Sequence, residues 1–150
     1  MLSEVGISEA QSVLDFGCGS GTYSIPAAKL VGKNGRIYSL DISQKALQTI
    51  INKAEREGLD NIITLLSTGS IETSIENEEI NHVLLIDVLQ EISNTKTLLE
   101  EIYRILKPDG LMIVYPMHID PNEVIKLASN LKFRLKRRIF QERILVFEKL

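Results

Sequence analysis

Short apolar runs alternate with longer stretches of helical period along this chain, and this alternation limits the fold more than any other feature. The runs SVLDF, RIYSLD, NIITLL, NHVLLID and GLMIVYP occupy residues 12–16, 36–41, 61–66, 81–87 and 110–116. Their apolar residues are mostly continuous rather than alternating, which is typical of strands buried on both faces of a parallel sheet. With helical stretches between them, the runs predict βαβ units with right-handed crossovers, and therefore an α/β fold.

Three amphipathic stretches are predicted to be the crossover helices. In residues 43–58, apolar side chains fall at spacings of one, three and four, with Ser43 as a plausible N-cap and Gly58 as a stop. Residues 94–106 repeat the pattern, and the sequence KPDG at 107–110 is expected to end that helix and turn into the fifth strand. The stretch 20–31 contains Pro26, which should bend or shorten its helix.

The C-terminal part of the chain departs from this alternation. Residues 120–130 look helical, with Pro121 near the first turn, and LKFRLKRRIF and ERILVFEKL then follow with only a short turn between them. Two strands so close in sequence must pair antiparallel, because a parallel pair needs a crossover of a dozen or more residues. The sheet is therefore predicted to be mostly parallel and to end in an antiparallel hairpin.

Composition is that of an ordinary globular protein. The chain has 150 residues, with 44% apolar and 25% charged residues, which fits one domain spanning residues 1–150. No apolar run approaches the roughly 20 residues that span a bilayer, and the N-terminus does not resemble a signal peptide, so we expect a cytoplasmic protein with no membrane partner. The single cysteine, Cys18, excludes a disulfide and a cysteine-based zinc site, and no spacing suggests a metal.

Charge is unevenly distributed along the sequence. Residues 1–125 carry nine basic and eighteen acidic residues, whereas residues 126–150 carry eight basic and two acidic ones. A basic C-terminal end is compatible with binding to a polyanion such as RNA. It is equally typical of a strand pair whose charged edge prevents edge-to-edge association, and the alternation in KFRLKRRIF favours that second interpretation.

A glycine-rich turn follows the first predicted strand and precedes a predicted helix. It reads Asp15-Phe16-Gly17-Cys18-Gly19-Ser20-Gly21. The spacing is G-x-G-x-G, which differs from the G-x-G-x-x-G of dinucleotide sites, and the G-K-[ST] ending of a P-loop is missing. A carboxylate at Asp15 would repel a pyrophosphate and attract a cation such as an ammonium group. S-adenosylmethionine carries an ammonium and a sulfonium and no phosphate, so it fits this turn better than a dinucleotide does.

Asp41 ends the second predicted strand. An acidic side chain at this place can accept hydrogen bonds from both hydroxyls of an adenosine ribose, a geometry that nicotinamide enzymes also use. The alternative is a turn or capping residue in front of Ser43. The glycine-rich turn one strand earlier favours the ligand role.

Four segments together resemble a known family. VLDFGCGSGTYS, GRIYSLDIS, NHVLLIDVLQEI and LLEEIYRILKPDGLMIVYP are similar to successive motifs of the class I S-adenosylmethionine-dependent methyltransferases, over roughly residues 5–116. The final hairpin resembles the last two strands of that family. The resemblance implies a three-layer αβα, doubly wound fold with a seven-stranded sheet of order 3-2-1-4-5-7-6. It also implies S-adenosylmethionine as methyl donor and S-adenosylhomocysteine as product.

The resemblance further implies which residues bind the cofactor. Asp15 and the backbone of Gly17, Cys18, Gly19 and Gly21 would hold its methionine part, and Asp41 its ribose. Ile42 would pack on the adenine. The family often has an acidic residue after the third strand, where this chain has Ser67-Thr68-Gly69-Ser70, so Gly69 backbone or the Ser70 hydroxyl would take its place. Asp87, at the end of the fourth strand, would face the reacting end of the cofactor.

Catalytic residues are less evident. Asp87, Glu91 and Tyr115 are candidates for a general base because of their location, and Glu91 stands where many small-molecule members of the family have a histidine. Cys18 is interpreted as a small loop residue rather than a nucleophile. His82 and His118 have no metal-ligand spacing and are each expected at the surface, although His118 follows the fifth strand and could line the site.

The expected function is methyl transfer by direct displacement to a small-molecule or protein acceptor. The chain has no N/D-P-P-Y motif for methylating the amino group of a nucleic-acid base, and no cysteine placed for cytosine or arsenic chemistry. The alternatives are an RNA methyltransferase that uses the basic hairpin and a non-catalytic, cofactor-binding scaffold. Only about eleven residues precede the first predicted strand, which suggests an open site or one covered by a second copy or another partner.

Overall fold

The computed structural model describes residues 1–150, which divide into two compact units, Met1–Ser70 and Ile71–Leu150. Taken in order, the strands run β3-β2-β1-β4-β5-β7-β6, which confirms the expected order. No helix is long and apolar enough to cross a membrane. The expectation of a single domain over residues 1–150 stays a prediction.

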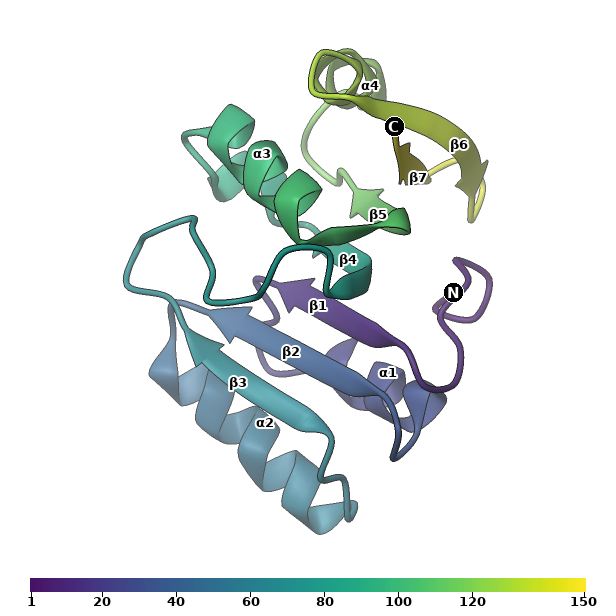
Figure 1. Ribbon diagram of the computed structural model, residues 1–150. Coiled ribbons are helices and arrows are strands. Elements are labelled where there is room, and N and C mark those ends of the chain that lie inside the picture. Colours follow the sequence, from purple (N-terminus) through teal and green to yellow (C-terminus); the bar gives the residue numbers. More distant parts are fainter. The chain divides into compact units, whose positions relative to one another are not determined.

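The first unit consists of three parallel strands and two helices. The strands are β1 (Ser12–Phe16), β2 (Arg36–Asp41) and β3 (Ile62–Leu66), and the helices are α1 (Ser24–Val31) and α2 (Gln44–Arg56). β2 lies between β1 and β3, with Asp15 opposite Ser39 and Asp41 opposite Leu66. In Figure 1 both helices lie behind this part of the sheet. The carboxyl ends of β1 and β2 therefore lie side by side, which is where parallel sheets bind ligands.

Both helices of the first unit end where their sequences predict, and α2 also begins there, but α1 begins at Ser24, later than the expected stretch 20–31. Ser43 caps α2 by accepting a hydrogen bond from the backbone N–H of Ala46 at 3.1 Å, and Gly58 follows the helix with a positive φ of 68°. Pro26 lies in the first turn of α1, which has only eight residues, as the proline predicted. Leu47, Ile50 and Ala54 of α2 pack with Ile25 of α1 and Cys18 into a buried cluster below the glycine-rich turn.

The second unit holds the rest of the sheet. Its elements are β4 (Ile80–Ile86), the 3-10 helix η1 (Leu89–Glu91), α3 (Thr95–Ile105), β5 (Leu106–Tyr115), α4 (Pro121–Ser129), β6 (Phe133–Ile139) and β7 (Ile144–Lys149). β4 and β5 are parallel, whereas β7 runs antiparallel to both β5 and β6. The predicted C-terminal hairpin is confirmed, and the basic strand β6 ends the strand order.

The expected turn at residues 107–110 is wrong in one respect. β5 begins at Leu106, directly after α3, and Leu106 already pairs with Ile80. The next pair joins His82 to Leu111, so the extra residues of β5 form an irregularity inside the strand. Gly110 permits this tight path, since an added Cβ would lie 2.9 Å from the carbonyl oxygen of Lys107. The residues KPDG do interrupt the regular pairing of β5. Because β5 pairs with β4 both before and after them, the chain forms a bulge there instead of reversing.

Candidate functional site

The glycine-rich turn folds back over the end of β2. Gly17, Gly19 and Gly21 all have positive φ values, of 73°, 53° and 91°. The N–H groups of Gly17 and Cys18 donate to the carbonyl oxygen of Leu40 at 2.8 and 3.0 Å, and that of Gly21 donates to the carbonyl of Cys18 at 3.1 Å. Gly21 is also fixed by close packing, because an added Cβ would lie 2.8 Å from Cγ1 of Ile50. The turn is thus a defined, internally bonded structure.

Asp41 connects this turn to the start of α2. Its Oδ2 accepts the N–H of Gly19 at 2.8 Å, and its Oδ1 accepts the N–H of Ser43 at 2.9 Å. Both interpretations of Asp41 therefore have support, since it orders the residue before α2 and is held rigidly beside the glycine-rich turn. A carboxylate oxygen can accept a second hydrogen bond, so this carboxylate can still receive two hydroxyl donors.

The turn is better suited to a cationic group than to a phosphate. Phosphate sites in such turns present backbone N–H groups to the ligand. Here the N–H groups of Gly17, Cys18, Gly19 and Gly21 are all used inside the fold. The carbonyl oxygens of Cys18 and Gly21 already accept from Gly21 and Ile25, so those of Gly17 and Gly19 are the acceptors that the turn can offer. Carbonyl oxygens suit an ammonium donor, and this agrees with the cofactor that the sequence favoured over a dinucleotide.

Asp15 is almost fully buried, with 2% of its surface exposed. The Ser24 hydroxyl donates to its Oδ2 at 2.7 Å, and Ser24 also lies 2.7 Å from the hydroxyl of Ser39. Burial raises the pKa of Asp15 to about 6, and the negative charge of Asp41 adds to the rise while the Ser24 hydrogen bond opposes it. A cation at the turn would stabilise the ionised form, so the predicted role in holding an ammonium group is chemically reasonable.

Cys18 behaves as the sequence suggested. It is buried in the cluster below the turn. Burial, together with the charges of Asp15 and Asp41, raises the pKa of its thiol well above the ordinary value. The thiol therefore stays protonated, which is unsuitable for a nucleophile.

Two apolar side chains lie exposed near Asp41. Ile42 is 75% exposed, and Leu66, which is opposite Asp41 in the sheet register, is about half exposed. Ile42 was predicted to pack on adenine, and it is accessible for that contact. Leu66 was not foreseen, although its place at the end of the third strand was a signal. Beyond it, Ser67 accepts the N–H of Gly69 at 3.3 Å and donates to the carbonyl of Ser70 at 3.1 Å, so these residues form an exposed turn.

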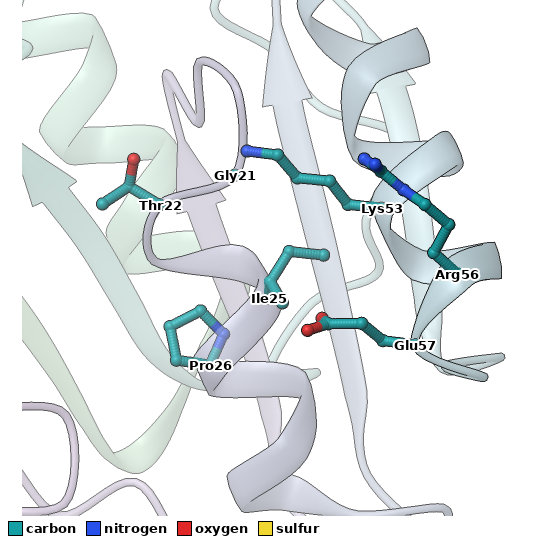
Figure 2. Close-up of a pocket in the computed structure, with 7 residues that line it drawn as sticks. All are labelled: Gly21, Thr22, Ile25, Pro26, Lys53, Arg56 and Glu57. Carbon is teal, nitrogen blue, oxygen red and sulfur yellow. The ribbon is translucent and has the colours of Figure 1, made fainter.

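A groove of about 510 Å³ lies between the glycine-rich turn, α1 and α2. Figure 2 shows Lys53 reaching from α2 toward the turn, with Arg56 one turn further along the helix. The Lys53 ammonium donates to the carbonyl oxygen of Ser20 at 2.9 Å. Glu57 on the same rim is paired with Lys29 at 3.0 Å. Lys53 therefore supports the turn from outside, a contact that no local pattern in the sequence indicated.

In the second unit, Asp87 is the centre of a small polar cluster at the ends of β4 and β5. Its backbone has a positive φ of 53°, and its N–H donates to the carbonyl oxygen of Tyr115 at 3.1 Å. The Gln90 amide donates to the Asp87 carbonyl at 3.0 Å and to its Oδ1 at 2.7 Å. Nε2 of His118 lies 3.6 Å from the same Oδ1. Asp87, Tyr115 and His118 are thus brought together, Gln90 was missed, and Glu91 lies exposed at the end of η1.

The expectation for His82 is wrong. His82 is the third residue of β4, as expected of a strand start, but it is buried with the residues that follow it and does not lie at the surface. No group of three or more acidic, histidine or cysteine side chains in the structure is arranged to hold a metal ion.

Comparison with known proteins agrees with this geometry. A family model described as a methyltransferase domain matches residues 7–140. A demethylmenaquinone methyltransferase of Lactobacillus johnsonii is 31% identical over 122 residues, covering 81% of this chain and 50% of that protein. This chain thus spans about half the length of the curated relatives that it matches.

Solved structures show the same fold. A SAM-dependent methyltransferase from Aquifex aeolicus superimposes with a TM-score of 0.85 at 23% identity, covering 98% of this chain and 86% of that one. A coclaurine N-methyltransferase bound to N-methylheliamine and SAH gives a TM-score of 0.67 at 26% identity, covering 75% of this chain and 33% of that one. With the family model matching most of the sequence, these findings confirm the resemblance: the chain belongs to the methyltransferase-domain family.

Proposed function

We propose that this chain binds S-adenosylmethionine and transfers its methyl group to a small organic acceptor. The observation that carries the proposal is the Asp41 carboxylate, held by backbone N–H groups of Gly19 and Ser43 beside a glycine-rich turn. This arrangement offers acceptors to a ribose diol and carbonyl oxygens to an ammonium group, and these are the polar groups of S-adenosylmethionine. The cofactor itself supplies an activated methyl group on a sulfonium leaving group.

Different residues of the first unit bind different parts of the cofactor. Asp41 binds the ribose hydroxyls, and the exposed Ile42 and Leu66 side chains cover the adenine. The backbone of the glycine-rich turn and Asp15 hold the amino-acid end. Gly69 and Ser70, in the turn after β3, take the position at which the adenine amino group would find a partner. In the second unit, Asp87, Glu91 and Tyr115 belong to the acceptor side. Fixing both reactants in line can supply about 7–11 kcal/mol of the barrier reduction.

A small organic acceptor is supported by the names of two relatives. One is named for demethylmenaquinone and the other for coclaurine, so both act on small ring compounds rather than on macromolecules. The structure also weakens the RNA alternative. Arg134 and Lys136 of β6 both pair with Glu148, and Arg138 lies 3.9 Å from Glu142. Two carboxylates thus offset half of the four positive charges on this strand, which is compatible with a protected sheet edge.

The proposal also includes a cover over the acceptor side, formed by a second copy of the chain or by another protein. The support is the accessibility of that side, where Asp87 is 39% exposed and Glu91 is exposed as well. Light scattering with and without S-adenosylhomocysteine tests it, because an active monomer would exclude this cover.

Calorimetric titration tests the function itself. The purified chain is titrated with S-adenosylmethionine, S-adenosylhomocysteine and NAD, and we expect saturable binding of the first two and none of NAD. Transfer of a radiolabelled methyl group to a panel of phenols, quinols and amines then tests turnover. Binding without turnover over the whole panel would favour a cofactor-binding scaffold, and binding of NAD alone would contradict the proposal.

A further inference from the structure

The two terminal strands of the strand order differ sharply in charge. β3 and β6 each have one edge that no other strand covers. β6 has four basic residues among its seven, whereas β3 reads IITLL and has no charged residue. Natural sheets protect exposed edges with charged side chains, because the unpaired backbone groups there recruit other strands. The edge of β3 has no such protection.

The pairing of β3 with β2 determines which backbone groups lie on this open edge. Ile37 of β2 donates to the carbonyl oxygen of Asn61 at 2.9 Å, and Ser67 donates to the carbonyl oxygen of Asp41 at 2.9 Å. In a parallel ladder, alternate residues bond to the same neighbour, so the odd-numbered residues of 61–67 bond to β2. Three residues therefore direct their N–H and C=O groups to the open side: Ile62, Thr64 and Leu66.

The side chains of β3 are apolar on both of its faces and partly exposed. Figure 1 shows β2 along one side of β3 and no further strand along the other. Ile62 packs against the buried cluster of α2, and Thr64 and Leu66 share its face, because side chains alternate along a strand. Ile63 and Leu65 lie on the opposite face. Leu66 is 51% and Ile63 is 38% exposed, so this edge is accessible to another strand.

The three residues that face outward are arranged symmetrically about Thr64. When a second copy of β3 runs antiparallel to the first, Thr64 lies opposite Thr64 of the other copy, and Ile62 lies opposite Leu66. Each pair exchanges both backbone hydrogen bonds, so all three outward residues are paired. Ile63 then lies opposite Leu65, which is an apolar cross-strand pair. β3 has no charge with which to select an acidic or basic segment, but it is complementary to its own sequence.

We propose that two copies of this chain associate by antiparallel pairing of their β3 strands, related by a two-fold axis at Thr64. Each copy uses the same edge, so the assembly closes after two chains. Like charges directly opposite each other disfavour the same pairing between two β6 strands, so the sheet does not extend at its other end. The inference goes beyond the proposed function and does not depend on cofactor binding.

Light scattering of the purified chain over a range of concentrations tests the association. We expect the mass to rise from 16.9 kDa toward twice that value. Thr64→Lys places two ammonium groups opposite each other at the two-fold axis and should raise the dimer dissociation constant at least about tenfold. Thr49→Lys makes the same change at an exposed position of α2 and should associate as the wild type does. A wild type that stays at 16.9 kDa, or equal dissociation constants of the two variants, would overturn the proposal.

Disulfide cross-linking tests the register of the pairing with a smaller change to β3. In a hydrogen-bonded antiparallel pair the two Cα atoms are about 5.5 Å apart, which a disulfide can span. Thr64→Cys should therefore form a covalent dimer on mild oxidation. Leu66→Cys is the control, because in this register four strand residues separate the two introduced thiols by about 13 Å. The native Cys18 is buried and does not interfere. Equal yields of covalent dimer from the two variants would overturn the pairing about Thr64.

Discussion

Gly19 donates its backbone N–H to Oδ2 of Asp41 at 2.8 Å, across 22 positions of sequence. This hydrogen bond joins the glycine-rich turn after β1 to the last residue of β2. It makes the shape of the turn dependent on the same carboxylate that is proposed to bind the ribose. In the proposed binding mode, one side chain therefore couples cofactor recognition to the conformation of the turn.

Replacing Asp41 should therefore lower the affinity for the cofactor more than it lowers the stability of the fold. Asp41→Ala removes two possible hydrogen bonds to the ribose and the support of Gly19, and each bond to a charged group is worth about 1.5–3 kcal/mol. We expect S-adenosylhomocysteine affinity to fall at least about tenfold in calorimetric titration. Asp60→Ala, an exposed change in the same unit, is the control and should bind normally. Equal affinity in both variants would exclude a ribose contact by Asp41.

Burial of Asp15 should make stability depend on pH. Its pKa is about 6 in the folded chain and 3.8 as the reference for the unfolded one, so the folded state binds more protons between these values. The contribution of Asp15 to the free energy of unfolding is therefore present at low pH and is lost as pH rises from about 4 to about 6. The loss reaches at most about 3 kcal/mol, because one pKa unit corresponds to about 1.36 kcal/mol.

Asp15→Asn isolates that contribution. The amide keeps an oxygen for the Ser24 hydroxyl and does not ionise, so the variant should gain stability relative to the wild type as pH rises through this range. Urea unfolding at pH 4, 5, 6 and 7 measures the difference. A difference that stays constant with pH would show that Asp15 does not titrate in this window.

Features encoded by local sequence were predictable. The apolar runs predicted the strands. Ser43 and Gly58 marked the ends of α2, and Pro121 marked the first turn of α4, because helix ends depend on only a few neighbouring residues. The spacing of Gly17, Gly19 and Gly21 likewise predicted a turn that needs positive φ values.

Features that depend on sheet register or on distant contacts were not predictable. The bulge in β5 follows from how β4 pairs with β5, which no local pattern contains. The contact of Gln90 and His118 with Asp87 depends on chain segments that meet only after the strands have paired. The bond between Lys53 and Ser20 spans 33 positions, and a lysine on an exposed helix gives no sign of it.

Lys53 should contribute to cofactor binding without touching the cofactor. Its ammonium donates to the carbonyl oxygen of Ser20 at 2.9 Å and so supports the glycine-rich turn. Lys53→Met keeps the length of the side chain and removes one hydrogen bond, worth about 1 kcal/mol. We expect a loss of S-adenosylhomocysteine affinity of about fivefold by calorimetry. Lys45→Met on the same helix is the control, and an equal loss there would point to net charge instead of turn support.

Glu101 should be the most sensitive charged residue for the stability of the second unit. It is buried, and it accepts hydrogen bonds from the backbone and hydroxyl of Thr73 at 2.6 and 2.8 Å and from Arg104 at 2.7 and 2.9 Å. Burial alone would raise its pKa, but the hydrogen bonds of Arg104 and Thr73 outweigh burial and hold the pKa of Glu101 below its ordinary value of 4.5. Arg104 also donates to the carbonyl oxygen of Ile75 at 2.8 Å, so this pair fixes the segment before β4.

Glu101→Gln should therefore lower the free energy of unfolding by about 1–3 kcal/mol at pH 7, because it leaves Arg104 without its carboxylate. A lowered pKa stabilises the fold above the unfolded value and loses that effect as pH falls through the folded value. The difference between variant and wild type should then shrink steadily below about pH 4.5 in urea unfolding. Glu100→Gln, at the neighbouring exposed position on α3, should change stability by less than about 0.5 kcal/mol. A Glu101→Gln effect as small as this control would mean that water replaces the carboxylate without cost, and the segment before β4 would then be held by its backbone alone.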